Sequence, residues 1–266
     1  MALSIIIMGA AGRMGRTLVR LVSEAEDLSL AAALERNSDL DKLNDLKAAG
    51  ITVSDNIAEV LQQMPKNSVI IDFTAPEATM KTLEAALASG VPMVIGTTGF
   101  SDAQLAALEQ AAKRIPLFRS ANMSVGVNVI MDILPQLTSM LGDGYDAEIM
   151  EIHHNKKKDA PSGTALLLAE PVLKAKGLTN DDIAVNRFDR REPRRHDEVG
   201  IQSLRGGDVV GVHTVYYFGA GERIEITHHA HSRDNFAIGA LRASRWLSTQ
   251  QPGRLYNMQD VLHATA

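Results

Sequence analysis

The sequence predicts an α/β domain with a parallel sheet, joined to an α+β domain with a mixed or antiparallel sheet. Short apolar runs alternate with helical patterns over the first half of the chain, which is typical of a parallel sheet covered by helices. Glycines follow the first apolar run, where a helical pattern begins. After residue 124, a long helical pattern precedes several strands that are separated by glycine-containing turns.

The elements of the first domain follow from the spacing of apolar residues. Short apolar runs predict strands at Leu3–Met8, Leu28–Leu34, Val69–Phe73, Met93–Ile95 and Leu117–Arg119. Apolar residues three or four apart predict helices at Arg13–Glu26, Asn56–Met64, Glu77–Ser89 and Asp102–Lys113. The order is strand, helix, strand throughout, so we expect the strands to run parallel.

The second part of the chain predicts a sheet of its own. Helices are predicted at Val125–Leu141 and Gly163–Lys176, and strands at Asp146–Ile152, Val199–Leu204, Val209–Phe218 and Arg223–His229. The turns at 205–208 and 219–221 predict an antiparallel meander. The last helix, Asn235–Leu247, holds the only Trp and is expected to pack on the first domain. We therefore expect residues 1–124 and 234–266 to form the first domain and residues 125–233 the second.

The composition is that of a globular protein and excludes several kinds of chemistry. The 266 residues are 45% hydrophobic and 22% charged, and 27 Lys and Arg against 32 Asp and Glu give a net charge of −5. Nucleic-acid-binding proteins usually have the opposite balance. The absence of Cys excludes disulfides, thiolate metal sites and cysteine nucleophiles.

The sequence carries no pattern of a targeting or membrane segment. The apolar run at residues 1–8 lacks a basic flank and a small-residue cleavage site, so it predicts a strand and not a signal peptide. No run approaches the ~18 consecutive apolar residues of a membrane span. We expect a cytoplasmic protein that binds neither nucleic acid nor membrane.

The segment Gly9-Ala10-Ala11-Gly12-Arg13-Met14-Gly15 lies where the first strand turns into the first helix, the position of the dinucleotide fingerprint. Gly9 allows the tight turn, Gly12 the approach of a pyrophosphate to the helix N-terminus, and Gly15 close packing of helix on strand. The spacing is G-x-x-G-x-x-G, with Ala11 in the usual second glycine position. It predicts a Rossmann-like dinucleotide-binding domain; the alternative is a glycine-rich turn without a ligand.

Two further features follow strands of the same sheet. Glu35 ends the second strand twenty residues after Gly15, where an acidic residue commonly binds the adenosine ribose hydroxyls. Arg36 is suited to a 2′-phosphate, so the pair predicts that both NADH and NADPH are accepted. The backbone and hydroxyls of Gly96-Thr97-Thr98-Gly99 are expected to face the nicotinamide. The alternatives are a solvated strand end at Glu35 and a helix N-cap turn at 96–99.

The segment His153–Thr164, HHNKKKDAPSGT, follows a strand and opens a helix. A histidine exchanges protons near neutral pH, and nearby lysines attract an anionic substrate. The turn Pro161-Ser162-Gly163-Thr164 offers backbone N–H groups at a helix N-terminus to a carboxylate. The alternatives are a solvated loop at Lys156–Lys158 and structural histidines at 153 and 154.

Four motifs in the same order resemble the 4-hydroxy-tetrahydrodipicolinate (dihydrodipicolinate) reductase family. They are the glycine loop, Gly96–Gly99, Ser120–Asn128 and His153–Thr164, which together span most of the chain. The H-H-x-x-K-x-D-A-P-S-G-T pattern is highly specific to that family. The resemblance implies reduction of a small dicarboxylate, 4-hydroxy-tetrahydrodipicolinate, to tetrahydrodipicolinate with NADH or NADPH, in the diaminopimelate route of lysine biosynthesis.

The resemblance also implies roles for individual residues. His153 matches the family's proton donor and acceptor, and Lys157 its second proton donor. Substrate-binding positions match His154, Gly163 and Thr164. Cofactor-binding positions match Gly9, Ala10, Ala11, Gly12, Arg13, Met14, Glu35, Arg36, Gly96, Thr97, Thr98, Ser120, Ala121, Asn122 and Met123. The family's second domain builds a homotetramer, so the sheet between residues 199 and 229 is the expected subunit interface.

The remaining motifs bear on alternative interpretations. Short-chain dehydrogenases share the glycine spacing but need a Tyr-x-x-x-Lys pair, and none of the four tyrosines has Lys four residues later. A nucleotide-sensing protein without turnover, or another NAD(P)-dependent oxidoreductase, is the alternative function. No metal site is expected at His228, His229 and His231, because strand neighbours point to opposite faces. The arginine-rich segment Asp189–His196 is expected to be a solvated loop, with closure over an anionic substrate as the alternative.

Overall fold

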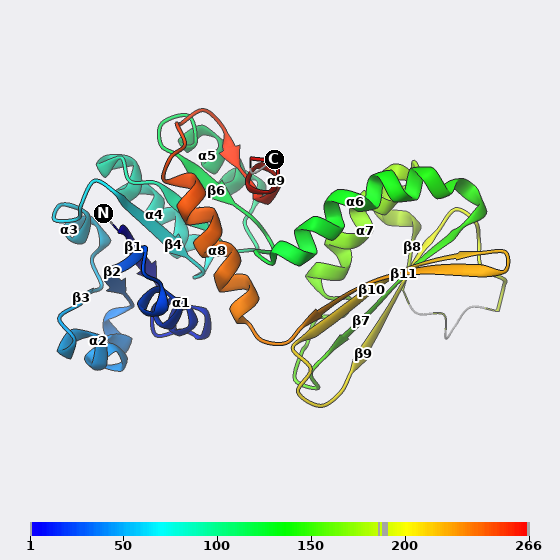
Figure 1. Ribbon diagram of the computed structural model, residues 1–266, viewed down its shortest axis with the longest axis horizontal. Coiled ribbons are helices and arrows are strands. Elements are labelled where there is room, and N and C mark those ends of the chain that lie inside the picture. The colour runs from blue at the N-terminus through cyan, green and yellow to red at the C-terminus, as the bar shows by residue number, and fades with distance from the viewer. Residues whose placement is uncertain (1, 186, 188–190, 265–266) are drawn as a thin grey trace. The chain divides into compact units, whose positions relative to one another are not determined.

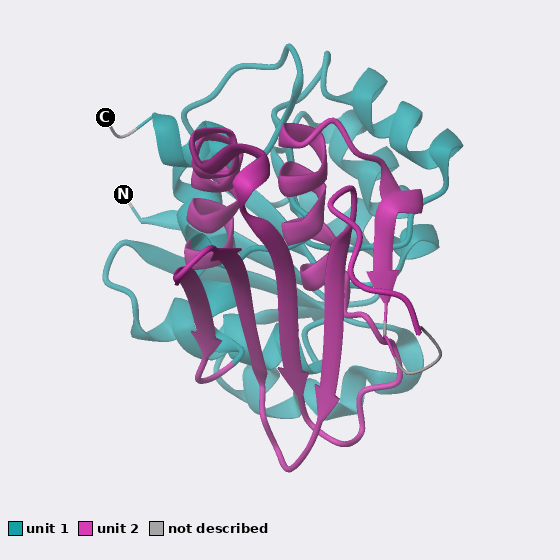
Figure 2. Ribbon diagram, turned by 90° about the vertical axis from the view of Figure 1, so that its right-hand side faces the viewer, with its two compact units in different colours: residues 1–125, 233–266 teal, residues 126–232 magenta. Residues whose placement is uncertain are grey.

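The computed structural model describes residues 2–185, 187 and 191–264, and the chain divides into two compact units. Unit 1 comprises Met1–Val125 and Arg233–Ala266, and unit 2 comprises Gly126–Ser232 (Figure 2). Asp189 and Arg190 of the predicted arginine-rich loop lie outside the described residues.

Unit 1 is built on a parallel sheet with the strand order β12-β6-β5-β4-β1-β2-β3 (Figure 1). The strands are β1 (Leu3–Met8), β2 (Leu28–Leu34), β3 (Thr52–Ser54), β4 (Ser68–Asp72), β5 (Met93–Ile95), β6 (Leu117–Arg119) and β12 (Leu255–Tyr256). The helices are α1 (Arg13–Glu24), η1 (Asn37–Leu43), α2 (Asn44–Ala48), α3 (Ile57–Leu61), α4 (Pro76–Ser89), α5 (Asp102–Ala111), α8 (Asp234–Leu247) and α9 (Met258–His263).

Both faces of this sheet are covered, which explains why its strands are continuous apolar runs. In β1, Ile5, Ile6 and Ile7 are all fully buried. Ile5 and Ile7 pack in one core cluster with Leu18 of α1 and Ala240 of α8. Ile6 points to the other face and packs with residues of α3, α4 and α5. The sheet is therefore the middle layer of three.

Unit 1 closes with elements from the end of the chain. A Cβ on Gly239 of α8 would lie 1.7 Å from the Met123 carbonyl oxygen, so this helix can pack there only with glycine at that position. Trp246 contacts the ring of Tyr256 edge-on at 5.0 Å between centroids. Several short elements of this unit, namely β3, β12, η1, α2 and α9, were not predicted from the sequence.

Unit 2 contains a mixed sheet with the order β11-β10-β7-β9-β8. Its strands are β7 (Asp146–His153), β8 (Ile183–Val185), β9 (Val199–Arg205), β10 (Gly211–Gly219) and β11 (Glu222–Ala230). Its helices are α6 (Val125–Leu141), which begins one residue before the unit, η2 (Gly142–Gly144), α7 (Gly163–Ala175) and η3 (Asn180–Asp182). Residues of α6 and α7 share one core cluster with the strands, so both helices lie on the same face of the sheet (Figure 1).

The predicted antiparallel meander is wrong for β9. This strand pairs in parallel with β7 and β8, and β7 separates it from β10. The connection from β9 to β10 crosses the end of β7 and is bonded there: Gly206 N donates to His153 O (2.9 Å), and His154 N donates to Val209 O (2.8 Å). The hairpin prediction holds for β10 and β11, which pair along their whole length.

The face of this sheet opposite α6 and α7 carries large apolar side chains. Strand alternation places Met150, Ile152, Leu204 and Phe218 there. Leu204 is 46% exposed and Phe218 is 40% exposed, although both are apolar. Tyr216 stacks on Phe218 with 5.6 Å between the ring centroids.

The segment Val125–Gly144 bears on the prediction that the chain contains no membrane span. It is long and apolar enough to cross a membrane by length and composition, and 22% of its apolar window is buried. Asn128 and Asp132 interrupt its apolar residues, so it contains no long unbroken apolar run. Core helices of soluble proteins meet the same criterion, and the finding is weak evidence for a membrane span.

Candidate functional site

The strands of the parallel sheet end at one level. Met8 is in register with Leu34 and with Asp72 on the neighbouring strands. Asp72 is in register with Ile95, which is in register with Arg119. The predicted cofactor-binding residues follow these strand ends and lie in the segments Gly9–Gly15, Glu35–Arg36, Gly96–Gly99 and Ser120–Met123. Because the strands are parallel, these segments start at the carboxyl edge of the sheet, where open α/β sheets bind ligands.

The glycine loop has the geometry of an anion cradle. Gly9 has φ +69°, in the left-handed region that favours glycine. A Cβ on Gly15 would lie 2.2 Å from the Gly9 carbonyl oxygen, so helix α1 reaches the loop only without a side chain there. Gly12 is the N-cap of α1 and supplies no side-chain cap, and the first turn, which starts with Arg13 and Met14, contains no acidic residue. The N–H groups of this turn are therefore available to a negatively charged group.

Glu35 is brought directly to this loop. Its Oε2 accepts a hydrogen bond from Ala11 N (3.1 Å), and its Oε1 accepts one from Arg36 N (2.9 Å). The Glu35 side chain is 11% exposed, whereas that of Arg36 is 81% exposed and pairs with Asp39 at 2.6 Å. The structure thus holds the carboxylate in place and leaves the guanidinium at the surface.

The hydroxyl of Thr97 is buried and hydrogen-bonded inside unit 1. Thr97 is 3% exposed; its Oγ1 accepts a hydrogen bond from Thr79 Oγ1 (2.9 Å) and donates to Asp72 Oδ1 (3.3 Å). Asp72 Oδ1 also accepts from Thr74 N (2.8 Å) and Thr74 Oγ1 (2.5 Å). Burial raises the pKa of Asp72, whose Oδ2 is buried and has no hydrogen-bond partner in the part of the chain that the structure describes. Thr98 is exposed at the edge.

The segment that follows β6 presents mainly backbone to the edge of the sheet. Ser120 Oγ donates to the Asn122 carbonyl oxygen (2.6 Å), and Asn122 Oδ1 accepts from Ser124 N (2.8 Å). Ala121 is exposed. The side chain of Met123 is 1% exposed and lies in the core with α1 and α8.

In unit 2, His153 is nearly buried and paired with a carboxylate. His153 Nδ1 lies 2.5 Å from Glu151 Oε2, and Glu151 is fully buried. Arg205 of β9 binds the same carboxylate through both terminal nitrogens, at 2.7 and 2.8 Å. Burial lowers the pKa of His153, the Glu151 carboxylate raises it, and the charges of Lys157 and Arg205 lower it.

The loop after β7 distinguishes one lysine from its neighbours. Lys156 and Lys158 are exposed, whereas the Lys157 side chain is 21% exposed and pairs with Asp159 at 2.8 Å. The ammonium of Lys157 lowers the pKa of Asp159. His154, half-buried, has its Nδ1 buried without a hydrogen-bond partner among the described residues. A ligand with a hydrogen-bonding group would satisfy that nitrogen.

The N-terminus of α7 is fixed to the same cluster. Ser162 is the N-cap, and its Oγ accepts from Ala165 N (3.2 Å). The same Oγ lies 3.0 Å from His213 Nε2, and burial lowers the pKa of His213 to about 3. Gly163 is exposed and Thr164 is half-buried at the first turn of the helix. This places the predicted carboxylate-binding residues beside His153.

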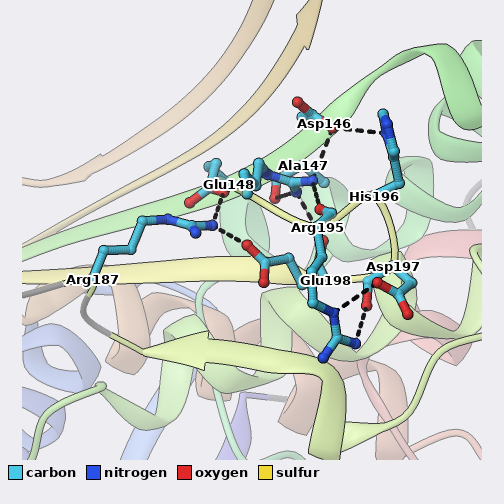
Figure 3. Close-up of polar contacts among 9 residues, drawn as sticks. Asp146, Ala147, Glu148, Arg187, Arg195, His196, Asp197 and Glu198 are labelled. Atoms are coloured by element: carbon cyan, nitrogen blue, oxygen red, sulfur yellow. Dashed lines mark hydrogen bonds and ion pairs between the residues drawn. The ribbon is translucent and has the colours of Figure 1, made fainter. Parts of the chain in front are cut away.

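The arginine-rich loop does not match the expected solvated loop at Arg194. Figure 3 shows the polar contacts around it, among them Arg187 with Glu148 and Glu198. The Arg194 guanidinium donates to Glu148 Oε1 (2.9 Å), Asp146 Oδ1 (2.8 Å) and the Ala147 carbonyl oxygen (3.1 Å), all on β7. It also donates to the Glu198 carbonyl oxygen at 2.8 Å. These contacts occupy the guanidinium N–H groups with which Arg194 would have to bind an anionic substrate if the loop closed over it.

Four residues of these clusters were not predicted from the sequence: Asp72, Glu151, Arg205 and His213. Glu151 stands two residues before His153, the spacing that puts two strand residues on one face. This two-residue spacing is the sequence signal that could have identified Glu151 as a partner of His153. The contribution of Arg205 depends on the parallel pairing of β7 with β9, which the predicted meander did not include.

The described residues contain no group of three or more His, Cys, Asp or Glu side chains placed to hold a metal ion. The predicted cofactor-binding residues all lie in unit 1, and the predicted acid–base and substrate-binding residues all lie in unit 2.

The loop and carboxylate at the edge of a parallel sheet are typical of dinucleotide-dependent oxidoreductases, in which a second domain supplies the acid–base groups. Two family models match the chain: "Dihydrodipicolinate reductase, N-terminus" over residues 3–123, and "Dihydrodipicolinate reductase, C-terminus" over residues 126–262. The 4-hydroxy-tetrahydrodipicolinate reductases of Nitratidesulfovibrio vulgaris (strain DP4) and Oleidesulfovibrio alaskensis are 53% and 50% identical, over 98% of this chain and 100% of each relative. The chain belongs to the dihydrodipicolinate reductase family.

The predicted oxidoreductase activity and the predicted use of NADH or NADPH are confirmed by this membership. The solved structure "Dipicolinate bound Dihydrodipicolinate reductase from Paenisporosarcina sp. TG-14" has a TM-score of 0.77 and 24% identity, and covers 97% of this chain and 98% of its own. A probable dehydrogenase from Thermotoga maritima has a TM-score of 0.65 and 12% identity, with 98% and 93% covered. The predicted Rossmann-like domain with a second mixed sheet is confirmed.

Proposed function

We propose that this chain reduces 4-hydroxy-tetrahydrodipicolinate to tetrahydrodipicolinate with NADH or NADPH, in the diaminopimelate route of lysine biosynthesis. The substrate loses its hydroxyl as water and gains a hydride and a proton. The observation that carries the proposal is the cluster in unit 2, where the Glu151–His153 pair, Lys157 and the N-terminus of α7 lie together. The relatives named for this activity are similar over nearly the entire chain.

The first domain, predicted as residues 1–124 and 234–266 and corresponding to unit 1, is the dinucleotide-binding domain. The Gly9–Met14 loop receives the pyrophosphate at its helical end, through the N–H groups of Arg13 and Met14 in the first turn of α1, and Glu35 binds the adenosine ribose hydroxyls. The exposed Arg36 is free to turn from Asp39 to a 2′-phosphate, which fits acceptance of both cofactors. Residues 96–98 and 120–123 offer backbone groups to the nicotinamide half. The reduced nicotinamide supplies the hydride when bound.

The second domain, predicted as residues 125–233 and corresponding to unit 2, binds the substrate. Gly163 and Thr164 at the N-terminus of α7 bind one carboxylate, and His154 supplies a further hydrogen bond. Lys157 attracts the dianionic substrate and donates a proton. His153, held by Glu151, acts as proton donor and acceptor, and Lys157 is the second proton donor. An acidic chain thereby presents a local cationic site to a dicarboxylate.

The sheet of unit 2 also suits assembly into a homotetramer. Its apolar face with Leu204 and Phe218 is partly exposed, and burying it against other subunits removes apolar surface from water. A reductase that draws on the cellular NADH and NADPH pools is expected in the cytoplasm.

A coupled assay tests this proposal. Fresh product of the preceding synthase is supplied, and the oxidation of NADH and of NADPH is followed separately. Oxidation that depends on the dicarboxylate is the expected result. Binding of NADH without any substrate-dependent oxidation would instead favour a nucleotide-sensing protein.

A further inference from the structure

We propose that Glu151 is a positioning residue for His153: its carboxylate fixes the ring hydrogen on Nδ1, so that Nε2 is the atom that exchanges a proton with the substrate. This inference deepens the proposed function and rests on the role proposed there for His153. It concerns a residue that acts through another and does not itself touch the substrate.

The contacts of Glu151 define which atom carries the hydrogen. Its Oε2 lies 2.5 Å from His153 Nδ1 and accepts from Arg205 Nη1 at 2.8 Å. Its Oε1 accepts from Arg205 Nη2 at 2.7 Å and from Ser162 N at 3.1 Å. Guanidinium and backbone N–H groups only donate, so both carboxylate oxygens act as acceptors. An acceptor opposite Nδ1 requires that Nδ1 carries the hydrogen.

The surrounding charges favour the same arrangement. Burial by itself raises the pKa of Glu151. The hydrogen bonds from Arg205 and His153 outweigh this effect and lower the pKa to about 2. The carboxylate is thus ionised at neutral pH. The groups that face His153 are Glu151 on its own strand, Arg205 on β9, His213 on β10 and Lys157 on the following loop. Glu151 is the anion among these four.

The other ring nitrogen lies beside a residue without a side chain. A Cβ on Gly211 of β10 would be 3.1 Å from His153 Nε2. The His213 ring meets the His153 ring edge-on, with 5.1 Å between the centroids. Burial lowers the pKa of His213 to about 3, so it is neutral at neutral pH and adds no charge there. With Nδ1 engaged by Glu151, proton exchange falls to Nε2.

The same ion pair anchors the other reacting groups. The Ser162 N–H that binds Glu151 begins the turn into α7, where the substrate carboxylate is proposed to bind. Arg205 Nη2 also donates to the Asp159 carbonyl oxygen at 2.6 Å, and the Asp159 side chain holds Lys157. The buried Glu151–Arg205 pair therefore holds three parts of the site in place: His153, the loop that carries Lys157, and the start of α7. Misplacement of such groups by about 1 Å can cost on the order of 100-fold in rate.

NMR of nitrogen-labelled histidine in the wild-type chain tests the tautomer directly. The His153 signals, assigned by comparison with His153→Ala, are expected to show the hydrogen on Nδ1 at a pH where the ring is neutral. A hydrogen on Nε2 in the wild-type chain overturns the inference. This measurement does not depend on whether any variant folds.

Kinetics of Glu151→Gln test the consequence for catalysis. Loss of a carboxylate that orients a histidine costs from about 10²- to 10⁴-fold in turnover. We expect kcat to fall by about 100-fold or more, with KM for NADH within about twofold, since the cofactor candidates lie in unit 1. The pKa of the His153 step in the pH profile is expected to move down, because the carboxylate raises it. Glu151→Asp, which keeps the charge, should restore part of kcat.

The control is Glu192→Gln, the same chemical change at an exposed residue of unit 2. Retention of kcat and of the pH profile by folded Glu151→Gln, while His153→Ala loses activity, overturns the positioning role. The proposed function fails in a different way: the wild-type chain then does not oxidise NADH with the dicarboxylate, or His153→Ala keeps full turnover whatever Glu151 does.

Discussion

Replacing Gly15 by Ala is expected to weaken NADH binding through a small displacement of α1. The added Cβ would stand 2.2 Å from the Gly9 carbonyl oxygen and 2.6 Å from Ala10 Cα. Ordinary contacts of a Cβ start near 3.4 Å, so the helix must move by about 1 Å. Such a movement displaces the N–H groups of the first turn from the pyrophosphate. A lost hydrogen bond to a charged group costs about 1.5–3 kcal/mol, which is about 10- to 150-fold in Kd.

Titration of NADH into the purified chain, by calorimetry or by cofactor fluorescence, measures this Kd. The matched control is Gly253→Ala, at a position of the same unit where a Cβ meets nothing within 4 Å. Thermal unfolding should show a moderate loss for Gly15→Ala, of about 1–3 kcal/mol from overpacking. An NADH Kd within twofold of the Gly253→Ala value would refute the reasoning about the glycine loop.

Three further outcomes are expected. His153→Ala and Lys157→Ala should each lower kcat by about 10²- to 10⁴-fold with little change in KM for NADH, whereas the exposed Lys156→Ala should not; steady-state rates check this, and wild-type turnover in both variants would contradict the assigned roles. The pKa of Glu151 is about 2 in the folded chain against an ordinary 4.5, so its stabilising contribution is complete above pH 4.5 and is lost as the pH falls towards 2. Urea unfolding across that range should show the free energy of unfolding fall by about 3 kcal/mol in the wild-type chain and not in Glu151→Gln. An equal dependence of the unfolding free energy on pH in both chains would argue against this contribution. Because burial raises the pKa of Asp72 and its Oδ1 only accepts, Asp72→Asn should bind NADH nearly as well as wild type, whereas Asp72→Ala should bind it about 10-fold more weakly; equal binding by both variants would remove Asp72 from any role at the cofactor loops.

The order of elements could be predicted because local signals determine it. The runs at Leu3–Met8, Leu28–Leu34 and Val125–Leu141 have the same bounds in the structure as in the prediction. The short strands β8 and β12 have too few residues to give a periodic pattern, and they form because a neighbouring strand offers its edge. The parallel pairing of β9 with β7 joins strands that are far apart in the sequence, and the residues of the turns do not predict it.

The parts of the candidate site that lie within one short segment of the sequence could be predicted. The parts that the fold assembles from distant segments could not. The glycine loop and the His153–Thr164 segment each carry their chemistry within a few residues. Glu151 and Arg205 meet only because β7 and β9 pair in register, Ser203 opposite Glu151. The engagement of Arg194 with β7 likewise depends on tertiary structure, so its charge alone suggested a solvated loop.

The return of α8 to unit 1 has a consequence for biosynthesis. Ala237, Ala240 and Leu241 of this helix share a core cluster with Leu18 and Val22 of α1, yet they are translated only after all of unit 2. Unit 2 is one uninterrupted stretch of chain and can complete its fold as it leaves the ribosome. The first 125 residues must wait with the part of this sheet face that α8 covers still exposed until α8 emerges, so unit 1 is the part of this enzyme that is most exposed to aggregation during synthesis.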